Sequence, residues 1–162
     1  MLKYALLLIG LTVVLIESGP APVAAQTASQ TAPPAFNPGF ADLMNTLVQP
    51  RHAKLGLSAR EQNWTLARYA VHELKDSLAN IARWRPQFRN QSVADMMEAT
   101  TGDPIKGIEQ AIETRNLAQF NAAYARLTEG CNSCHAALNH EFIVIKEPDR
   151  SYFANQEFRP AK

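Results

Sequence analysis

Residues 117–138, LAQFNAAYARLTEGCNSCHAAL, decide the fold of this chain. Apolar residues and cysteines recur there at alternating spacings of three and four, which is typical of a helix with one buried face. The recurring positions are Leu117, Phe120, Tyr124, Leu127, Cys131, Cys134 and Leu138. Because both cysteines continue the apolar face, we expect their side chains to point into the interior of a helical bundle.

The end of this predicted helix carries a C-x-x-C-H motif, Cys131-Asn132-Ser133-Cys134-His135. This pattern attaches haem covalently, because two thiols on one helical turn can reach the two vinyl groups of one porphyrin. The adjacent imidazole is then held beside the iron as its proximal ligand. A redox dithiol with an incidental histidine is the alternative, but it needs a βαβ context that the sequence lacks. The motif therefore predicts one haem c, bound through Cys131 and Cys134, with His135 as an iron ligand.

Residues 1–25 have the features of a signal peptide. The chain begins with a short positive segment, Met1-Leu2-Lys3, followed by an apolar stretch from Leu6 to Ile16 and by small residues, Val23-Ala24-Ala25. The apolar stretch is shorter than the ~20 residues that a transmembrane helix needs. We therefore expect export to the periplasm and no membrane span after cleavage, with an uncleaved anchor as the alternative.

The mature chain is expected to be a single domain. Residues 26–39 are rich in proline and predict a linker, residues 40–140 a haem-binding four-helix bundle, and residues 141–162 a C-terminal extension. A net charge of +1 without a basic stripe argues against nucleic-acid binding. The predicted fold class is all-α, with haem c on the last helix.

The pattern before the last helix predicts further bundle helices. Ser58 and Glu61 fit a capping box that would begin a helix over residues 58–84, and Pro86 would end it. The buried face of this helix is expected to comprise Trp64, Ala67, Val71, Leu74, Leu78 and Ile81.

A third helix is expected to begin at Asp103-Pro104, as an N-cap followed by proline at the first helical position, and to reach about Arg115. Ile105, Ile108 and Ile112 would form its buried face, after a short separate turn around Val93, Met96 and Met97. Asn116 is expected to cap the fourth helix.

With these features the chain resembles the c-type cytochromes of the four-helix-bundle class, the cytochrome c′-like (class II) proteins. The resemblance covers about residues 40–140 and depends on the leader, the helical pattern and the C-terminal position of the motif. It implies electron transfer or gas binding in the periplasm, and it leaves pairing as a homodimer open. Cytochromes c′ usually carry a basic residue after the first motif cysteine, whereas this chain has Asn132.

The sixth iron position separates the two functions, and in such bundles the first helix covers it. Residues 40–56 fit that helix, with a kink expected at Pro50. His52 lies on its apolar face and is the first candidate for the distal ligand, while Met44 is the rival. A low-spin carrier would have such a ligand, whereas an open site would bind NO or CO.

The remaining candidates concern the surroundings of the haem. His72 is expected to form an interhelical hydrogen bond, and His140 to contact solvent or a propionate rather than to ligate iron. Arg51, Lys54, Arg83 and Arg85 are possible propionate partners by charge, with a solvated helix face as the alternative for each. The apolar run Phe142-Ile143-Val144-Ile145 predicts that the C-terminal extension packs back on the bundle, with a dimer or redox-partner surface as the alternative.

These observations predict a periplasmic monohaem cytochrome that passes single electrons between redox partner proteins. The alternative is a cytochrome c′-like gas-binding protein with an open distal site. Neither function is enzymatic. A haem enzyme is a third and weaker alternative, because one haem in one small domain leaves little room for a substrate pocket.

Overall fold

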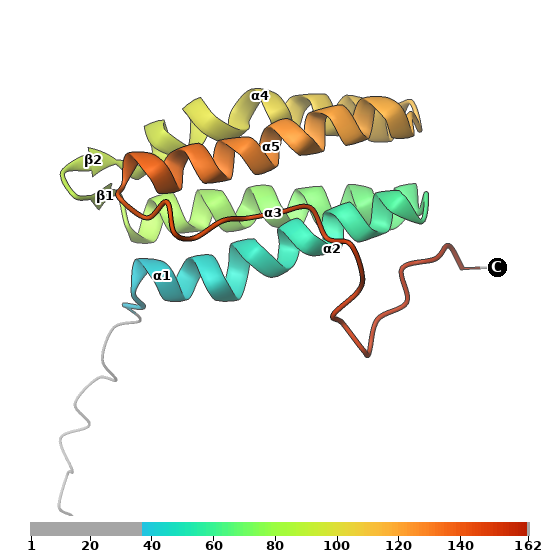
Figure 1. Cartoon of the computed structure of the whole chain (residues 1–162), viewed down its shortest axis with the longest axis horizontal. Coiled ribbons are helices and arrows are strands. Elements are labelled where there is room, and N and C mark those ends of the chain that lie inside the picture. The colour runs from blue at the N-terminus through green and yellow to red at the C-terminus, as the bar shows by residue number, and fades with distance from the viewer. Residues whose placement is uncertain (1–36, 162) are drawn as a thin grey trace, which may run out of the picture. The chain divides into compact units, whose positions relative to one another are not determined.

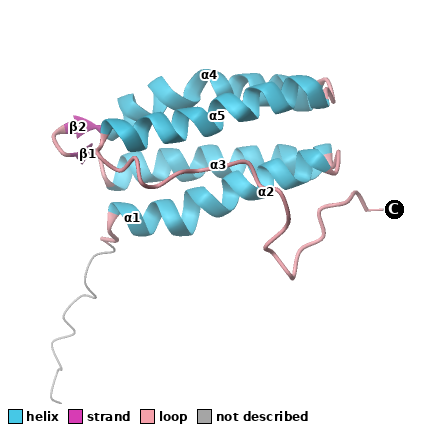
Figure 2. Cartoon of the chain, viewed as in Figure 1, coloured by secondary structure: helices cyan, strands magenta, loops and turns pink. Residues whose placement is uncertain are grey.

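The computed structural model describes residues 37–161, which are mostly helical (Figure 2). The predicted signal peptide and most of the predicted linker lie outside these residues. The elements are α1 (Phe40–Leu43), the π-helical segment η1 (Met44–Val48), α2 (Gln49–Arg60), α3 (Trp64–Trp84), β1 (Gln87–Phe88), β2 (Gln91–Ser92), α4 (Val93–Glu113) and α5 (Leu117–Ala137). Among the helices of these described residues, none is long and apolar enough to span a membrane.

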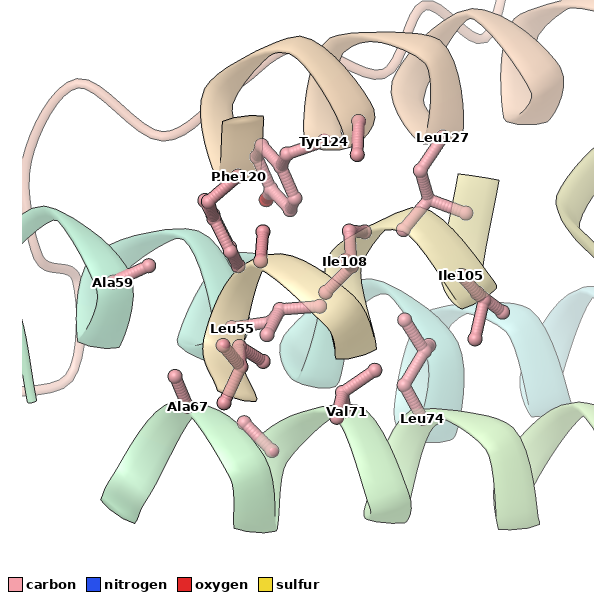
Figure 3. Packing of buried hydrophobic residues seen from close by; sticks show 14 residues of the cluster. Leu55, Ala59, Ala67, Val71, Leu74, Ile105, Ile108, Phe120, Tyr124 and Leu127 are labelled. Carbon is pink, nitrogen blue, oxygen red and sulfur yellow. The ribbon is translucent and has the colours of Figure 1, made fainter. Parts of the chain in front are cut away.

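The long helices pack side by side as neighbours in sequence order (Figure 1). Short connections join α2 to α3 and α4 to α5, so each pair forms a helical hairpin, and α3 also packs against α4. Figure 3 shows the centre of the core, where side chains from α2, α3, α4 and α5 converge. Leu55, Ile108, Phe120 and Leu127 are almost completely buried there. The helical bundle is the frame that positions the C-x-x-C-H motif.

The repeating apolar faces of α3 and α5 are confirmed. Ala67, Val71, Leu74 and Ile81 of α3 are buried, and α3 ends at Trp84, before Pro86. In α5 the buried residues include Phe120, Tyr124 and Leu127, and Asn116 caps the helix by accepting a hydrogen bond from the Gln119 amide (3.0 Å).

The first helical rod is longer than predicted and does not end at residue 56. It runs through α1, η1 and α2 to Arg60. Proline lacks the amide proton that an α-helix needs at its position. Pro50 lies in the first turn of α2, directly after the π-helical turns of η1, where the Gln49 amide bonds to the Met44 carbonyl. The disturbance expected at Pro50 therefore takes the form of a widened turn.

The predicted capping box at Ser58 is wrong. Ser58 is buried inside α2, and its hydroxyl donates to the Lys54 carbonyl of the preceding turn (2.6 Å). The helix break falls instead at Gln62, which has a positive φ of 53°, and Asn63 caps α3 by accepting from the Leu66 amide. The local pattern suited a cap, but the burial of residues 57–59 against the core keeps this segment helical.

The predicted helix start at Asp103-Pro104 is also wrong. Pro104 lies inside α4, which begins at Val93 and is capped by Ser92. The residues assigned to a separate turn, Val93 and Met97, are buried in the same continuous helix. Their apolar contacts with α3 and with the first rod hold the helix together across the proline.

Pro104 and Gly130 together explain how closely α4 and α5 approach. Proline at 104 cannot donate to the carbonyl four residues earlier, that of Thr100. This same carbonyl faces Gly130, where any added Cβ would overlap with it. Only glycine at this position lets α5 lie against α4 directly before Cys131.

We predict that Gly130→Ala lowers the free energy of unfolding by about 1–3 kcal/mol, because the added methyl group must push two backbones apart. Urea unfolding of the full chain measures this. Gly102→Ala is the matched control, because the atoms nearest to its added Cβ belong to the carboxylate of Glu98, the flexible end of an exposed side chain. The control should be neutral or stabilised by up to about 1 kcal/mol. Equal effects of both variants would contradict this role of Gly130.

Candidate functional site

One cavity of about 330 Å³ joins the motif to the first helical rod. Its walls come from η1 and its flanks, from the first half of α4, from the end of α5 and from the segment after α5. The residues that matter most are Met44, Val48, His52, Met96, Thr100, Cys131, Cys134, His135, Ile143 and Ile145. Most of the lining is apolar, and the volume falls in the range of small-molecule and cofactor sites.

Cys131 and Cys134 lie one turn apart on α5, and both are half-buried at the cavity. They form no disulfide with each other. Burial raises the pKa of the Cys131 thiol to about 11, with a further contribution from Cys134, and burial also raises the pKa of Cys134. Redox-active C-x-x-C pairs have a lowered thiol pKa, because the thiolate is their nucleophile. The environment of these two thiols therefore argues against a dithiol catalyst.

His135 lines the same cavity, with one ring nitrogen already engaged. Its Nδ1 lies 2.7 Å from the Ile143 carbonyl oxygen. A carbonyl can only accept, so Nδ1 carries the proton. In the neutral ring the lone pair is then on Nε2, the nitrogen that remains for a metal.

The segment that supplies this carbonyl is tied to the motif by a second contact. We call residues 142–145 the strap. The side-chain amide of Asn132 donates to the Ile145 carbonyl (2.9 Å) and accepts from the Ile145 amide (2.7 Å). Ile143 and Ile145 line the cavity, whereas Phe142 and Val144 are 75% and 73% exposed.

The rest of the C-terminal extension continues along the bundle to the α2–α3 connection (Figure 1). Arg60 donates to the Asp149 carbonyl (2.7 Å), and Asn63 donates to the Phe158 carbonyl (3.1 Å). The Phe158 side chain is buried. These contacts attach the middle and the far part of the extension to the helices.

Met44 is placed on the wall formed by the first rod. Phe40, Met44 and Val48 recur every four residues and all line the cavity. Met44 is half-buried and lies in η1. π-Helical turns inside helices occur frequently at functional sites. The widened turn before Pro50 therefore coincides with the wall that faces the cavity.

His52 borders the cavity but is buried among hydrogen-bond partners. Its Nε2 lies 3.0 Å from the Thr128 hydroxyl, and its Nδ1 lies 3.1 Å from the Tyr124 hydroxyl. The Tyr124 hydroxyl also donates to the His52 carbonyl (2.7 Å), and the two rings stack. Iron ligation by His52 stays a prediction, and it would require one ring nitrogen to leave its hydroxyl partner. A buried polar group left unpaired in this way costs about 1–3 kcal/mol.

Of the other predicted polar candidates, only His140 lines the cavity. His72 is exposed and pairs with Asp76 on its own helix (3.3 Å), whereas His140 borders the cavity, with its Nδ1 2.8 Å from the Leu138 carbonyl. The four cations suggested as propionate partners, Arg51, Lys54, Arg83 and Arg85, are outside the cavity lining. Arg51 pairs with Glu73, and Arg85 donates to the Pro38 carbonyl.

Several site residues were missed in the sequence. Phe88 of the β1–β2 hairpin lines the cavity, and the neighbouring Arg89 donates to the Leu138 carbonyl at the end of α5 (2.6 Å). No local motif marks these residues. The continuous apolar run of the strap was visible in the sequence, but its partner Asn132 was not.

Comparisons with protein families, with curated proteins and with solved structures found no match to this chain. Residues 37–161 also contain no group of three or more His, Cys, Asp or Glu side chains arranged to hold a metal ion. The site must therefore be interpreted from its own geometry and chemistry.

The burial of His52 predicts a pH dependence of stability. Burial lowers the pKa of His52 from 6.5 to about 4. Below pH 6.5 the unfolded chain binds a proton that the folded chain does not, so stability is full above pH 6.5 and falls as the pH drops towards 4. Between pH 7 and pH 5 this one group should remove about 2 kcal/mol of unfolding free energy.

Urea unfolding of the wild type and of His52→Gln at both pH values measures this contribution as a difference between the two proteins. His72→Gln is the control, because His72 is exposed, and it should keep the wild-type pH dependence. If His52→Gln loses as much stability as the wild type on acidification, then His52 is not held neutral by the fold.

Proposed function

We propose that this chain is a monohaem c-type cytochrome that carries single electrons. The observation that carries the proposal is the common cavity: two unbonded thiols and a histidine with an available Nε2 lie on the wall of one apolar pocket. Haem c needs two thiols and one imidazole on adjacent turns, together with an apolar cavity that excludes water.

The residues present fit the group in chemistry as well as in position. Cys131 and Cys134 would form the thioether bonds, and His135 would ligate the iron through Nε2. The bound group supplies a one-electron Fe(III)/Fe(II) couple. The protein's own work is to hold the ligand histidine in one orientation, to keep water away with apolar side chains such as Val48 and Met96, and to set the polarity of the cavity.

Met44 would be the second protein ligand of the iron in this proposal. Its thioether lines the cavity from the first rod, and it needs no hydrogen bond to be broken before it can ligate. His52, in contrast, has a hydroxyl partner on each ring nitrogen and a lowered pKa, so its burial is already satisfied without iron. A His/Met pair gives a higher reduction potential than a bis-histidine pair.

A gas-binding protein is the second candidate, supported by the apolar character of the wall opposite the motif. Phe40 and Val48 flank Met44, and neither can ligate a metal. If Met44 does not ligate, the same wall would leave the sixth position open to NO or CO.

The proposal includes a compartment and partners. The leader-like residues 1–25 indicate export to the periplasm, the compartment in which haem c is attached, and an electron carrier there needs redox partner proteins. We propose no membrane span for the mature chain, and the resemblance to four-helix cytochromes leaves a homodimer open.

Visible spectroscopy tests the proposal on the full chain produced in a bacterial host that attaches haem c. The wild type should carry one haem that stays bound after denaturation, and Cys131→Ala with Cys134→Ala should abolish this. With Met44 as ligand, the ferric and ferrous spectra should be low-spin and unchanged by CO. Met44→Leu should become high-spin, bind CO and lower the reduction potential.

Two variants control this experiment. Met96→Leu removes a thioether from the opposite side of the cavity at almost constant volume, and it should keep the low-spin spectrum. His52→Gln should also keep it. A high-spin His52→Gln protein would assign the ligand to His52, whereas a wild type that binds CO would favour the gas-binding function. A chain that acquires no covalent haem would reject both.

A further inference from the structure

We propose that Asn132, between the two motif cysteines, is a positioning residue for His135 and acts through the strap. The inference depends on the proposed function, because it concerns how the iron ligand is oriented. It assigns a task to a residue that forms no bond to haem in the C-x-x-C-H motif.

The side chain of Asn132 binds the main chain of the strap. Its amide makes two hydrogen bonds to the main chain of a single residue, Ile145, one as donor and one as acceptor. An asparagine in this arrangement imitates a neighbouring strand, which fixes both the position and the rotation of the strap at that point. Only a side chain with a donor and an acceptor side by side can do this. Lysine has no acceptor, so the basic residue common after the first cysteine in cytochromes c′ could not replace it.

The strap also contacts His135, the proposed iron ligand. Asn132 and His135 are three residues apart and therefore lie on the same side of α5. The turn from His140 to Ile143, closed by the Ile143 amide on the His140 carbonyl (2.8 Å), leads the chain from the end of α5 into the strap. The Ile145 carbonyl accepts from Asn132, and the Ile143 carbonyl accepts from His135 Nδ1 at 2.7 Å. Because a single residue separates them, fixing residue 145 also limits how far the carbonyl of residue 143 can turn away from His135.

The Ile143 carbonyl would affect how His135 binds the iron. A carbonyl that accepts from Nδ1 fixes the tautomer and the ring orientation and makes Nε2 a stronger donor to the metal. A stronger imidazole donor favours Fe(III) and so lowers the reduction potential. The strap has few other attachments: the Ile143 amide donates to the His140 carbonyl (2.8 Å), while Phe142 and Val144 are exposed and contribute little burial. Asn132 thus supplies two of the hydrogen bonds that hold the strap near the ligand.

The test uses the full, haem-loaded chain and three variants. Asn132→Leu keeps the size and neutrality of the side chain but removes both hydrogen bonds, and Asn132→Ala removes its bulk as well. Ser133→Ala is the matched control, because Ser133 lies in the same motif and its hydroxyl bonds only to the Glu129 carbonyl of its own helix. Hydrogen exchange at the Ile145 amide reports the strap, and a redox titration reports the ligand.

We expect the Ile145 amide to exchange about tenfold faster or more in both Asn132 variants, as the loss of its hydrogen bonds requires. The Fe(III)/Fe(II) equilibrium should shift towards Fe(II) by up to about tenfold, which is a rise of ~59 mV for one electron. Ser133→Ala should change neither quantity.

Other outcomes overturn the inference in distinguishable ways. Faster exchange with an unchanged potential would mean that Asn132 holds the strap but does not act on the ligand. Unchanged exchange would mean that the clamp does not hold the strap. A wild-type chain without covalent haem would reject the proposed function and this inference together, whereas the first two outcomes would leave the proposed function intact.

Discussion

The close contact between the Thr100 carbonyl and Gly130 is the constraint on which the site depends. Pro104 leaves that carbonyl without its helical partner, and glycine at 130 lets α5 lie directly against it. The contact fixes α5 one residue before Cys131, at the edge of the cavity. Both thiols and His135 then follow at the spacing that a helix dictates. The position of the motif in the bundle is thus set by a backbone contact, and the motif itself adds only the chemistry.

The parts of this structure that were predicted correctly are those that one helix can encode alone. The apolar repeats of α3 and α5 are such features, because a buried face is a property of consecutive turns. The caps at Ser58 and Asp103 failed for the opposite reason. Each has the residues of a helix start, but the burial of residues 57–59 and of Val93 and Met97 kept the chain helical through both positions. Tertiary packing outweighed a local signal whose energy is only about 1 kcal/mol.

The same distinction between local pattern and tertiary packing applies to the site. Cys131, Cys134 and His135 lie close together in the sequence, so their joint binding of haem can be predicted from the pattern. The cavity wall formed by the first rod and the strap meet them only in the folded chain. His52 shows the limit of helical periodicity. It was placed correctly on an apolar face, but periodicity could not reveal that Tyr124 and Thr128 would engage both of its ring nitrogens.

The two sides of the cavity therefore differ in how firmly the fold holds them. The His52 side is buried and connected through hydroxyl groups to α5, so a change there would cost buried hydrogen bonds. The strap side is held by the hydrogen bonds of Asn132 and His135 and by one turn hydrogen bond from the Ile143 amide to the His140 carbonyl, with its neighbouring side chains in solvent. Since local stability follows the number of buried contacts, the strap is the side that can open without disturbing the core. Substitutions in the strap should consequently alter the environment of His135 while the helical bundle remains folded.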